Sequence, residues 1–492
     1  RSPSSLPNQV SFCWLRCQPT AFSTRLDRSQ QKETWFGKGL IVFLVLAAVV
    51  NFIAFRDYAF DDAFITFRYS ENVVQGLGPV YNAGERVEGY TCFSWMALLA
   101  IAGRFGIPIP MFAKAAGMLF VFGSVGLMAL WDRIDAAYTR TDALLCALGL
   151  ASTSAFVQWG VSGMETSLFC FAAVATVFSY TSLLRSKDIQ TAIILGMAGC
   201  LLTMTRPNGI VLLTVILGHA VWYRRSLPPR LIATFVGVFV LLYGSYFAWR
   251  WSYYGYLLPN TFYAKVGSSG AQVNRGIRYV VSAMPAFGLL IMPVVAGWGR
   301  KDERRRPEHV PDSRPLLLAL VITHLTYVIA VGGDNFPAHR FIVVIVPFLW
   351  LLAVRALPVL APTTPRRALL AAVLFGYNFV AHAFDPETRS RIARDYVAGD
   401  GKMVGRWLAL NTDPDAVIAT NSAGALAYYS GRTIVDMLGL NDAEIAHTPM
   451  ASMGHGKAGH EKGNGFYVLS RDPDYVFFGP PKGASRPMFT GD

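Results

Sequence analysis

Long apolar runs recur along the whole chain and constrain its fold more than any other feature. There are about eleven of them, and most approach the roughly 20 residues that a helix needs to cross a bilayer. Charged residues make up only 15% of the 492 residues, whereas a soluble domain carries roughly a quarter. The sequence therefore predicts a polytopic α-helical membrane protein. The runs lie near 39–55, 110–131, 142–158, 163–184, 189–204, 208–223, 229–248, 278–297, 315–331, 341–355 and 366–383.

The basic residues between these runs predict which side each loop faces. Lys and Arg gather in alternate short loops, which the positive-inside rule places in the cytoplasm. The net charge of +13 is thereby explained without a nucleic-acid partner. A shorter run, 92–102, would reverse every later loop if it crossed the membrane, so we interpret it as an interfacial helix on the outer leaflet. The predicted outer segments are 56–109, 159–162, 205–207, 249–277, 332–340 and everything after about 384.

The pattern changes at both ends of the chain. Residues 1–38 are polar and predict a disordered cytoplasmic tail. A transmembrane domain with an outer loop at 56–91 is expected over 39–384. Residues 385–492 alternate between strand and helix patterns, which predicts a small soluble α/β domain on the outer, periplasmic side. Its expected strands lie at 416–420, 433–436 and 475–478.

Two adjacent carboxylates, Asp61 and Asp62, follow the first apolar run. Carboxylates beside a bilayer are costly unless they face water, a cation or a substrate. If 60–72 is helical, Asp61 and Arg68 share one face, and Asp62 lies beside Tyr69 on the next. From spacing alone, a surface ion pair or a helix N-cap explains Asp61 equally well.

Three cations, Arg206, Lys265 and Arg340, lie at predicted outer boundaries of the membrane. Such residues often only anchor a helix to lipid head groups. Together with the acidic pair, however, they suit the transfer of a sugar from a lipid phosphate, which needs a base for the acceptor hydroxyl and positive charge on the departing phosphate. A metal is not obligatory for this chemistry, although Asp61 and Asp62 could hold Mg²⁺ or Mn²⁺.

The stretch from Asp61 to Tyr69 resembles the first outer loop of bacterial GT-C glycosyltransferases, in particular the mycobacterial-type terminal β-(1→2) arabinofuranosyltransferases. Further stretches resemble other motifs of that group, and together they extend from about residue 57 to 478. They are Gly76-Leu77-Gly78, Gly84 to Thr91, Ser162 to Thr166, Arg206 to Gly209, Pro259 to Lys265, Gly333-Asp334 with Arg340, Asp436 to Asp442, Gly459 to Lys462 and Asp472 to Tyr475.

This resemblance implies an inverting transferase in the bacterial inner (plasma) membrane, with its active site on the outer side. The donor would be a polyprenyl-phosphate sugar, arabinofuranose first, and the acceptor a hydroxyl of a cell-envelope glycan. Asp61 would be the general base and Asp62 would orient it or the acceptor. The donor phosphate would lie near Lys265, Arg340 and Arg206. The predicted acceptor- and sugar-binding residues are Arg68, Glu88, Tyr90, Asn260, Tyr263, Asp334 and His339.

Two departures from these relatives leave alternatives open. Asn208 stands where relatives often have Glu, and the C-terminal region is shorter than expected of an arabinosyltransferase. A GT-C transferase of mannose, glucose or galactose to lipopolysaccharide or protein is one alternative. A lipid-linked-sugar flippase is another, but it predicts polar residues through the bilayer and internal repeats, of which the sequence gives little sign. A third alternative is a scaffold protein of envelope assembly.

Overall fold

The computed structural model describes residues 59–223, 227–267, 269–298, 312–380 and 396–482. All of them belong to one compact unit, Val50–Asp492. The predicted tail 1–38 and the first predicted span, 39–55, lie outside the described residues.

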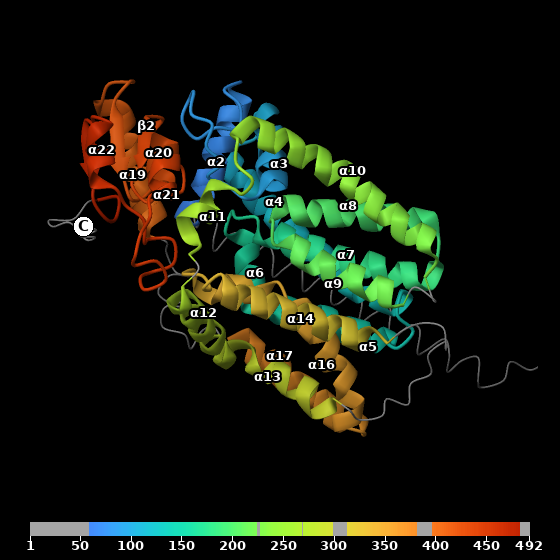
Figure 1. Ribbon diagram of the computed structural model, residues 1–492. Coiled ribbons are helices and arrows are strands. Elements are labelled where there is room, and N and C mark those ends of the chain that lie inside the picture. Colours follow the sequence, from blue (N-terminus) through green and yellow to red (C-terminus); the bar gives the residue numbers. More distant parts are fainter. Residues whose placement is uncertain (1–58, 224–226, 268, 299–311, 381–395, 483–492) are drawn as a thin grey trace, which may run out of the picture. The chain divides into compact units, whose positions relative to one another are not determined.

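Helices dominate this unit, as the apolar runs predicted (Figure 1). Each predicted run from residue 110 onward coincides with one helix or with a bent pair of helices. In chain order, the first helices are α2 (Asp61–Val74), α3 (Phe93–Arg104), α4 (Ile109–Ala129), η1 (Trp131–Arg133), α5 (Arg140–Ser152), α6 (Ser154–Val161), α7 (Thr166–Ser186), α8 (Ile189–Thr205) and α9 (Gly209–Trp222). They are followed by α10 (Pro229–Tyr254), α11 (Asn260–Lys265), α12 (Gly270–Ser282), α13 (Met284–Gly297), α14 (Ser313–Ala330), η2 (Pro337–His339), α15 (Arg340–Val343), α16 (Val346–Leu360) and α17 (Thr364–Val380).

Four helices in the described part, α4, α7, α10 and α14, are long and apolar enough to cross a bilayer alone. Three further pairs reach that length only together, and each pair is bent: 61° between α5 and α6, 74° between α12 and α13, and 71° between Pro337–Val343 and α16. Helix length thus gives four spans, or up to seven with the bent pairs, and the predicted number of about eleven is not confirmed.

Proline accounts for two of these bends. Pro285 stands in the first turn of α13 and Pro347 in the first turn of α16. There the missing amide hydrogen does no harm, but the proline ring would clash with the carbonyl four residues earlier, so the preceding helix cannot continue straight through it. At the third bend, Thr153 is extended and its hydroxyl donates to the Gly149 carbonyl 3.0 Å away. Sequence periodicity does not show such breaks, because the apolar pattern continues through them.

The long helices pack side by side around α7, which contacts α4 and α8, while α8 in turn contacts α10 (Figure 1). The short run predicted as an interfacial helix forms α3, which packs against α2 and α4. Its 12 residues are too few to cross a bilayer, as expected, and its position in the outer leaflet stays a prediction.

The C-terminal part contains a three-stranded parallel sheet in the order β2-β1-β3. Its strands lie within one residue of the predicted limits: β1 (Val417–Thr420), β2 (Thr433–Asp436) and β3 (Tyr475–Phe477). The helices of this part are α19 (Tyr396–Asn411), α20 (Ala425–Ser430), α21 (Ala443–His447) and α22 (Gly465–Ser470). A small apolar core joins Ala419, Val435, Met437, Ile445 and Val468. The predicted domain boundary at residue 385 falls outside the described ranges.

Candidate functional site

The acidic pair opens helix α2, and its two carboxylates have different surroundings. Phe60 is the N-cap residue and makes no side-chain cap; its ring stacks on Trp159 at 5.0 Å. The Asp61 carboxylate accepts hydrogen bonds from the backbone amides of Ala425 at 2.8 Å and Gly424 at 3.2 Å. Asp61 is therefore not the N-cap of its own helix but a partner of the first turn of α20.

Asp62 lies where two cavities formed by the described residues meet. We call the first, of about 300 Å³, the C-terminal cavity, because residues 396–480 supply much of its lining. We call the second, of about 460 Å³, the helix cavity, because it lies among the N-terminal part of α2, α11 and the turn between α8 and α9. The residues that line both are Asp62, Ile65, Lys265, Asn335, Leu440 and Ala458. Asp62 and Lys265 are thus the two charged side chains common to both cavities.

The helix cavity contains two buried ion pairs. Arg206 bonds the Glu165 carboxylate at 2.7 Å, and Arg340 bonds the Asp334 carboxylate at 2.7 Å. The Arg340 guanidinium also lies over the Phe336 ring, 4.1 Å from its centroid. Both arginines are therefore already compensated by a carboxylate, and they donate these polar bonds from Nε and Nη1.

Lys265 differs from the two arginines. Within the described ranges its ammonium makes neither a hydrogen bond nor an ion pair, and Gly459 packs against its aliphatic stem. An uncompensated cation beside Asp62 gives the junction of the two cavities the charge that a phosphate requires. Tyr90, another predicted site residue, lines the helix cavity, and its hydroxyl lies 3.2 Å from that of Tyr254.

Arg68, predicted to bind a sugar, lies instead in a protein-only network. Its guanidinium donates to four acceptors: the carbonyls of Tyr81, Ala427 and Arg432 and the side chain of Asn82. It is buried and does not line either of the two cavities described above. The prediction that Asp61 and Arg68 share one face of α2 is confirmed, since both side chains contact α20. There they bind protein groups rather than a ligand.

Glu88 also has a protein partner in place of the predicted acceptor. Its carboxylate accepts from Arg250 at 2.9 Å, and both side chains are buried. Burial raises the pKa of Glu88 to about 7, although the bond from Arg250 opposes the shift. The Glu88 carbonyl accepts from the backbone of Asn260, so this pair fixes the loop that leads to α11 and Lys265.

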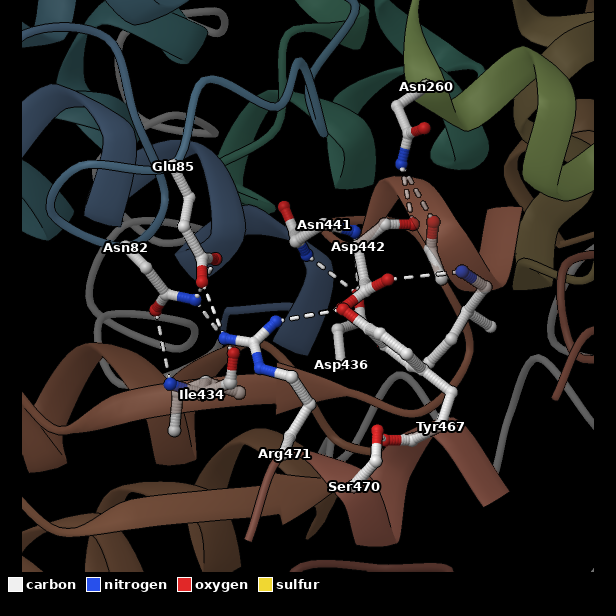
Figure 2. Close-up of polar contacts among 12 residues, drawn as sticks. Asn82, Glu85, Asn260, Ile434, Asp436, Asn441, Asp442, Tyr467, Ser470 and Arg471 are labelled. Carbon is white, nitrogen blue, oxygen red and sulfur yellow. Dashed lines mark hydrogen bonds and ion pairs between the residues drawn. The ribbon is translucent and has the colours of Figure 1, made fainter. Parts of the chain in front are cut away.

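Asn260, Tyr263 and His339 likewise contact protein groups, and they do not line either of the two cavities. The Asn260 amide donates to the carbonyls of Gly439, Leu440 and Asp442 (Figure 2). The Tyr263 ring lies 4.3 Å from that of His447, and His339 Nε2 lies 3.1 Å from the Ser282 hydroxyl. Of the seven residues predicted to bind acceptor or sugar, the cavities therefore include Tyr90 and Asp334.

The loop 436–442 supplies Leu438 and Leu440 to the lining of the C-terminal cavity. The Asp436 side chain stabilises this loop. Its buried carboxylate accepts from the amides of Leu438 and Asn441 and from the Asn441 side chain (Figure 2). Burial raises the pKa of Asp436 to about 6 against the effect of these bonds. Arg471 joins this region to the loop that follows α2, because its guanidinium lies 2.6 Å from the Glu85 carboxylate.

Sequence reasoning missed several residues that line the cavities. Glu165 occurs in a quoted motif but was not assigned to the site, and the structure pairs it with Arg206. Lys457 and His460 lie in a Gly-rich stretch that reads as a loop, and both line the C-terminal cavity. Burial lowers the pKa of His460. In both stretches, charged residues among glycines were the sequence pattern that could have identified these residues.

The acidic pair does not present two equivalent ligands to a cation. Both Asp61 oxygens accept amide hydrogens, which leaves Asp62 as the member of the pair that lines both cavities. Among the described residues, His, Cys, Asp and Glu do not form a group of three that could hold a metal. Mg²⁺ can be held by a single carboxylate with waters and a substrate phosphate.

The fold resembles that of ArnT from Cupriavidus metallidurans as crystallised with undecaprenyl phosphate: the TM-score is 0.57 at 14% identity, over 81% of this chain and 85% of that one. The apo ArnT structure gives the same TM-score over 86% of its chain. Residues 389–487 match a family described as a domain of unknown function (DUF8728).

Two curated relatives are similar in sequence. A terminal β-(1→2)-arabinofuranosyltransferase of Mycobacterium tuberculosis is 27% identical over 349 residues, 62% of this chain and 53% of that protein. A protein of the same name from Corynebacterium glutamicum is 25% identical over 393 residues, 68% and 54% respectively. The resemblance predicted from the motifs is thus confirmed, and the chain spans about half the length of these relatives.

Proposed function

We propose that this protein is an inverting glycosyltransferase. It moves a sugar from a polyprenyl-phosphate donor to a hydroxyl of a cell-envelope glycan on the outer side of the membrane, and we expect that sugar to be arabinofuranose. The sequence likeness to two arabinofuranosyltransferases supports the class of reaction. The likeness to ArnT, whose crystal structure contains undecaprenyl phosphate, supports a lipid-linked donor.

One observation carries the proposal: Asp62 and Lys265 line both cavities. A transferase must bring an acceptor hydroxyl and a donor phosphate to one point, with a base for the first and a cation for the second. The helix cavity combines apolar walls, such as Phe262 and Val211, with the paired arginines, and suits a lipid phosphate. The C-terminal cavity offers Asn421 and Ser422, and suits a glycan.

The reaction is then a single displacement. The acceptor hydroxyl loses its proton to the Asp62 carboxylate, and its oxygen attacks the anomeric carbon from the face opposite the phosphate. The bond between that carbon and the phosphate oxygen breaks, and its electrons leave with the polyprenyl phosphate. Lys265 and Arg340 stabilise the negative charge that grows on the leaving group.

The geometry favours Asp62 over Asp61 as the base. Asp61 accepts two backbone amides, and hydrogen bonds to a carboxylate stabilise its charged form and weaken it as a base. Asp62 lines both cavities, as Lys265 does, whereas Asp61 lines only the C-terminal cavity. We therefore assign proton transfer to Asp62 and a positioning role to Asp61.

The outer-side location rests on the direction of α7. This helix begins next to Glu165, in the lining of the helix cavity, and ends at Ser186. At that far end Arg185 donates to the Arg133 carbonyl, so two basic loops meet there. The positive-inside rule places these loops in the cytoplasm and hence the cavities at the outer surface.

The test is donor turnover by purified protein in lipid. Wild type would be given polyprenyl-phosphate arabinofuranose, mannose, glucose and galactose with an arabinan acceptor, with and without a chelator, and release of polyprenyl phosphate would be followed. We expect release from the arabinofuranose donor, reduced about 10²- to 10⁴-fold in Asp62→Asn. Glu71→Gln is the matched control, because it makes the same chemical change farther along α2.

Each other outcome has a defined meaning. Release from a different donor would replace the sugar and keep the class of enzyme, and loss of activity with the chelator would add a metal. Movement of lipid-linked sugar between leaflets without release would favour a flippase. Equal rates in Asp62→Asn and Glu71→Gln would remove Asp62 from the chemistry.

A further inference from the structure

Helix α2 holds the short helix α20 at both of its ends. The Asp61 carboxylate binds the amides of Gly424 and Ala425 at its start. Two turns along α2, the Arg68 guanidinium binds the carbonyls of Ala427 at 2.6 Å and Arg432 at 2.7 Å, within and just beyond its end. A carboxylate thus meets free amides and a cation meets carbonyls, the arrangement in which both charges are favourable. We call these contacts the α20 clamp.

At the Asp61 end of the clamp, the backbones of Gly424 and Asp61 pack closely together. A Cβ atom added to Gly424 would lie 2.0 Å from the Asp61 carbonyl oxygen, far inside any permitted contact. The space around Gly424 therefore requires a glycine at this position. The segment at 424 therefore lies directly on the backbone of the residue that precedes Asp62.

Two further contacts join the outer loop to the same segment. The Tyr81 hydroxyl donates to the Ala423 carbonyl, and the Asn82 side chain both donates to and accepts from the backbone of Ile434 (Figure 2). All of these groups are buried, so breaking a single bond would leave a polar group without water. The segment from 423 to 434 is therefore fixed to α2 and its following loop along its whole length.

The fixed segment also continues into the wall of the C-terminal cavity, through Asn421, Ser422 and Ala423. Lys457 and His460, from the same C-terminal part, line that cavity as well. One continuous piece of chain thus holds the start of α2 on one side and forms the proposed acceptor site on the other.

We propose that residues 396–482, the described part of the region that matches the domain of unknown function, help to form the catalytic site. Through the α20 clamp they fix Asp61, and thereby aim the adjacent Asp62 at the junction of the two cavities. Asp61, Arg68 and Gly424 are positioning residues in this scheme. The inference rests on the proposed function, because it needs Asp62 to be the base.

The experiment compares kcat and donor KM across four variants of the full-length protein in lipid. Gly424→Ala and Asp61→Ala should each lower kcat about a hundredfold, the effect of a small misplacement of a reacting group, with donor KM unchanged. Asp61→Asn should recover part of that loss, since it keeps one oxygen that can accept an amide. Gly463→Ala, a glycine of the same region whose Cβ would meet open space, should match wild type.

Combining Gly424→Ala with Asp61→Ala should cost little more than either alone, because both act through one contact. If Asp61 were itself the base, Asp61→Asn would be as inactive as Asp61→Ala, and the inference would be overturned. Wild-type kcat in Gly424→Ala, or fully additive losses, would overturn it too.

Hydrogen exchange separates failure of this inference from failure of the proposed function. Peptides covering 422–427 should exchange faster in Asp61→Ala than in wild type or in Gly463→Ala, because the clamp amides lose their acceptor. Unchanged exchange overturns the clamp whatever the activity. A wild type that transfers no sugar from any donor overturns the proposed function, while the exchange result still decides whether the clamp exists.

Discussion

The two cavities that meet at Asp62 differ in how their charges are balanced. In the helix cavity, Arg206 and Arg340 are each paired with a buried carboxylate of a neighbouring segment. At the junction with the C-terminal cavity, Lys265 stands without such a partner within the described ranges. The paired cations are tied to the stability of the fold, whereas Lys265 can act on a ligand without a cost to the fold. Substitutions on the two sides should therefore have different consequences.

The largest effect is expected from Arg340→Met, which leaves Asp334 as an uncompensated buried charge. Breaking such a pair costs about 3–5 kcal/mol, so thermal unfolding in detergent should shift strongly downward and donor turnover should be lost. The double variant Arg340→Met with Asp334→Leu should recover most of the stability but not the turnover. Equal melting temperatures of Arg340→Met and wild type would show that the pair does not hold the fold.

Lys265→Met should behave differently from Arg340→Met, because it removes a cation that makes neither a hydrogen bond nor an ion pair within the described ranges. The melting temperature should stay near that of wild type. Donor affinity should fall by about 1.5–3 kcal/mol, the strength of a hydrogen bond to a charged group, measured by binding of polyprenyl phosphate. Lys265→Arg should recover part of the affinity. A large loss of stability in Lys265→Met would instead make Lys265 a structural residue.

A smaller, pH-dependent effect is expected in the C-terminal part. Burial raises the pKa of Asp436 from its ordinary value of 3.8 to about 6 in the folded protein, so the folded state holds this proton more tightly than the unfolded state does. The resulting stability is fully present below pH 3.8 and is lost as the pH rises through 6, by at most about 3 kcal/mol. The melting temperature of wild type should therefore fall between pH 4 and 7 relative to that of Asp436→Asn, and parallel curves would contradict this assignment.

Sequence patterns predicted the elements of this fold better than the partners of individual side chains. Helices lie at every predicted run from residue 110, and the three strands lie within one residue of their expected limits, because periodicity and composition are local properties. The bends at Pro285 and Pro347 were missed, since the apolar pattern continues through them.

The candidate site was predicted in outline for the same reason. The ordered motifs identified Asp62, Lys265 and the two arginines, all of which line a cavity. They could not reveal that Arg68 would donate to the Ala427 carbonyl, or that Glu88 would form an ion pair with Arg250. Those partners lie 359 and 162 residues away in the chain, and spacing within one helix carries no information about contacts at that distance.

The bond between Asp61 and Gly424 joins residues 363 positions apart. During synthesis, α2 is made long before the segment that fixes it, and the whole chain from α3 to α17 must be made in between. A nascent chain therefore has its proposed base, Asp62, before it has the clamp that positions it. If the clamp works as proposed, catalysis begins only when the chain is complete. The membrane then does not receive a partly assembled enzyme that already consumes its lipid-linked sugar.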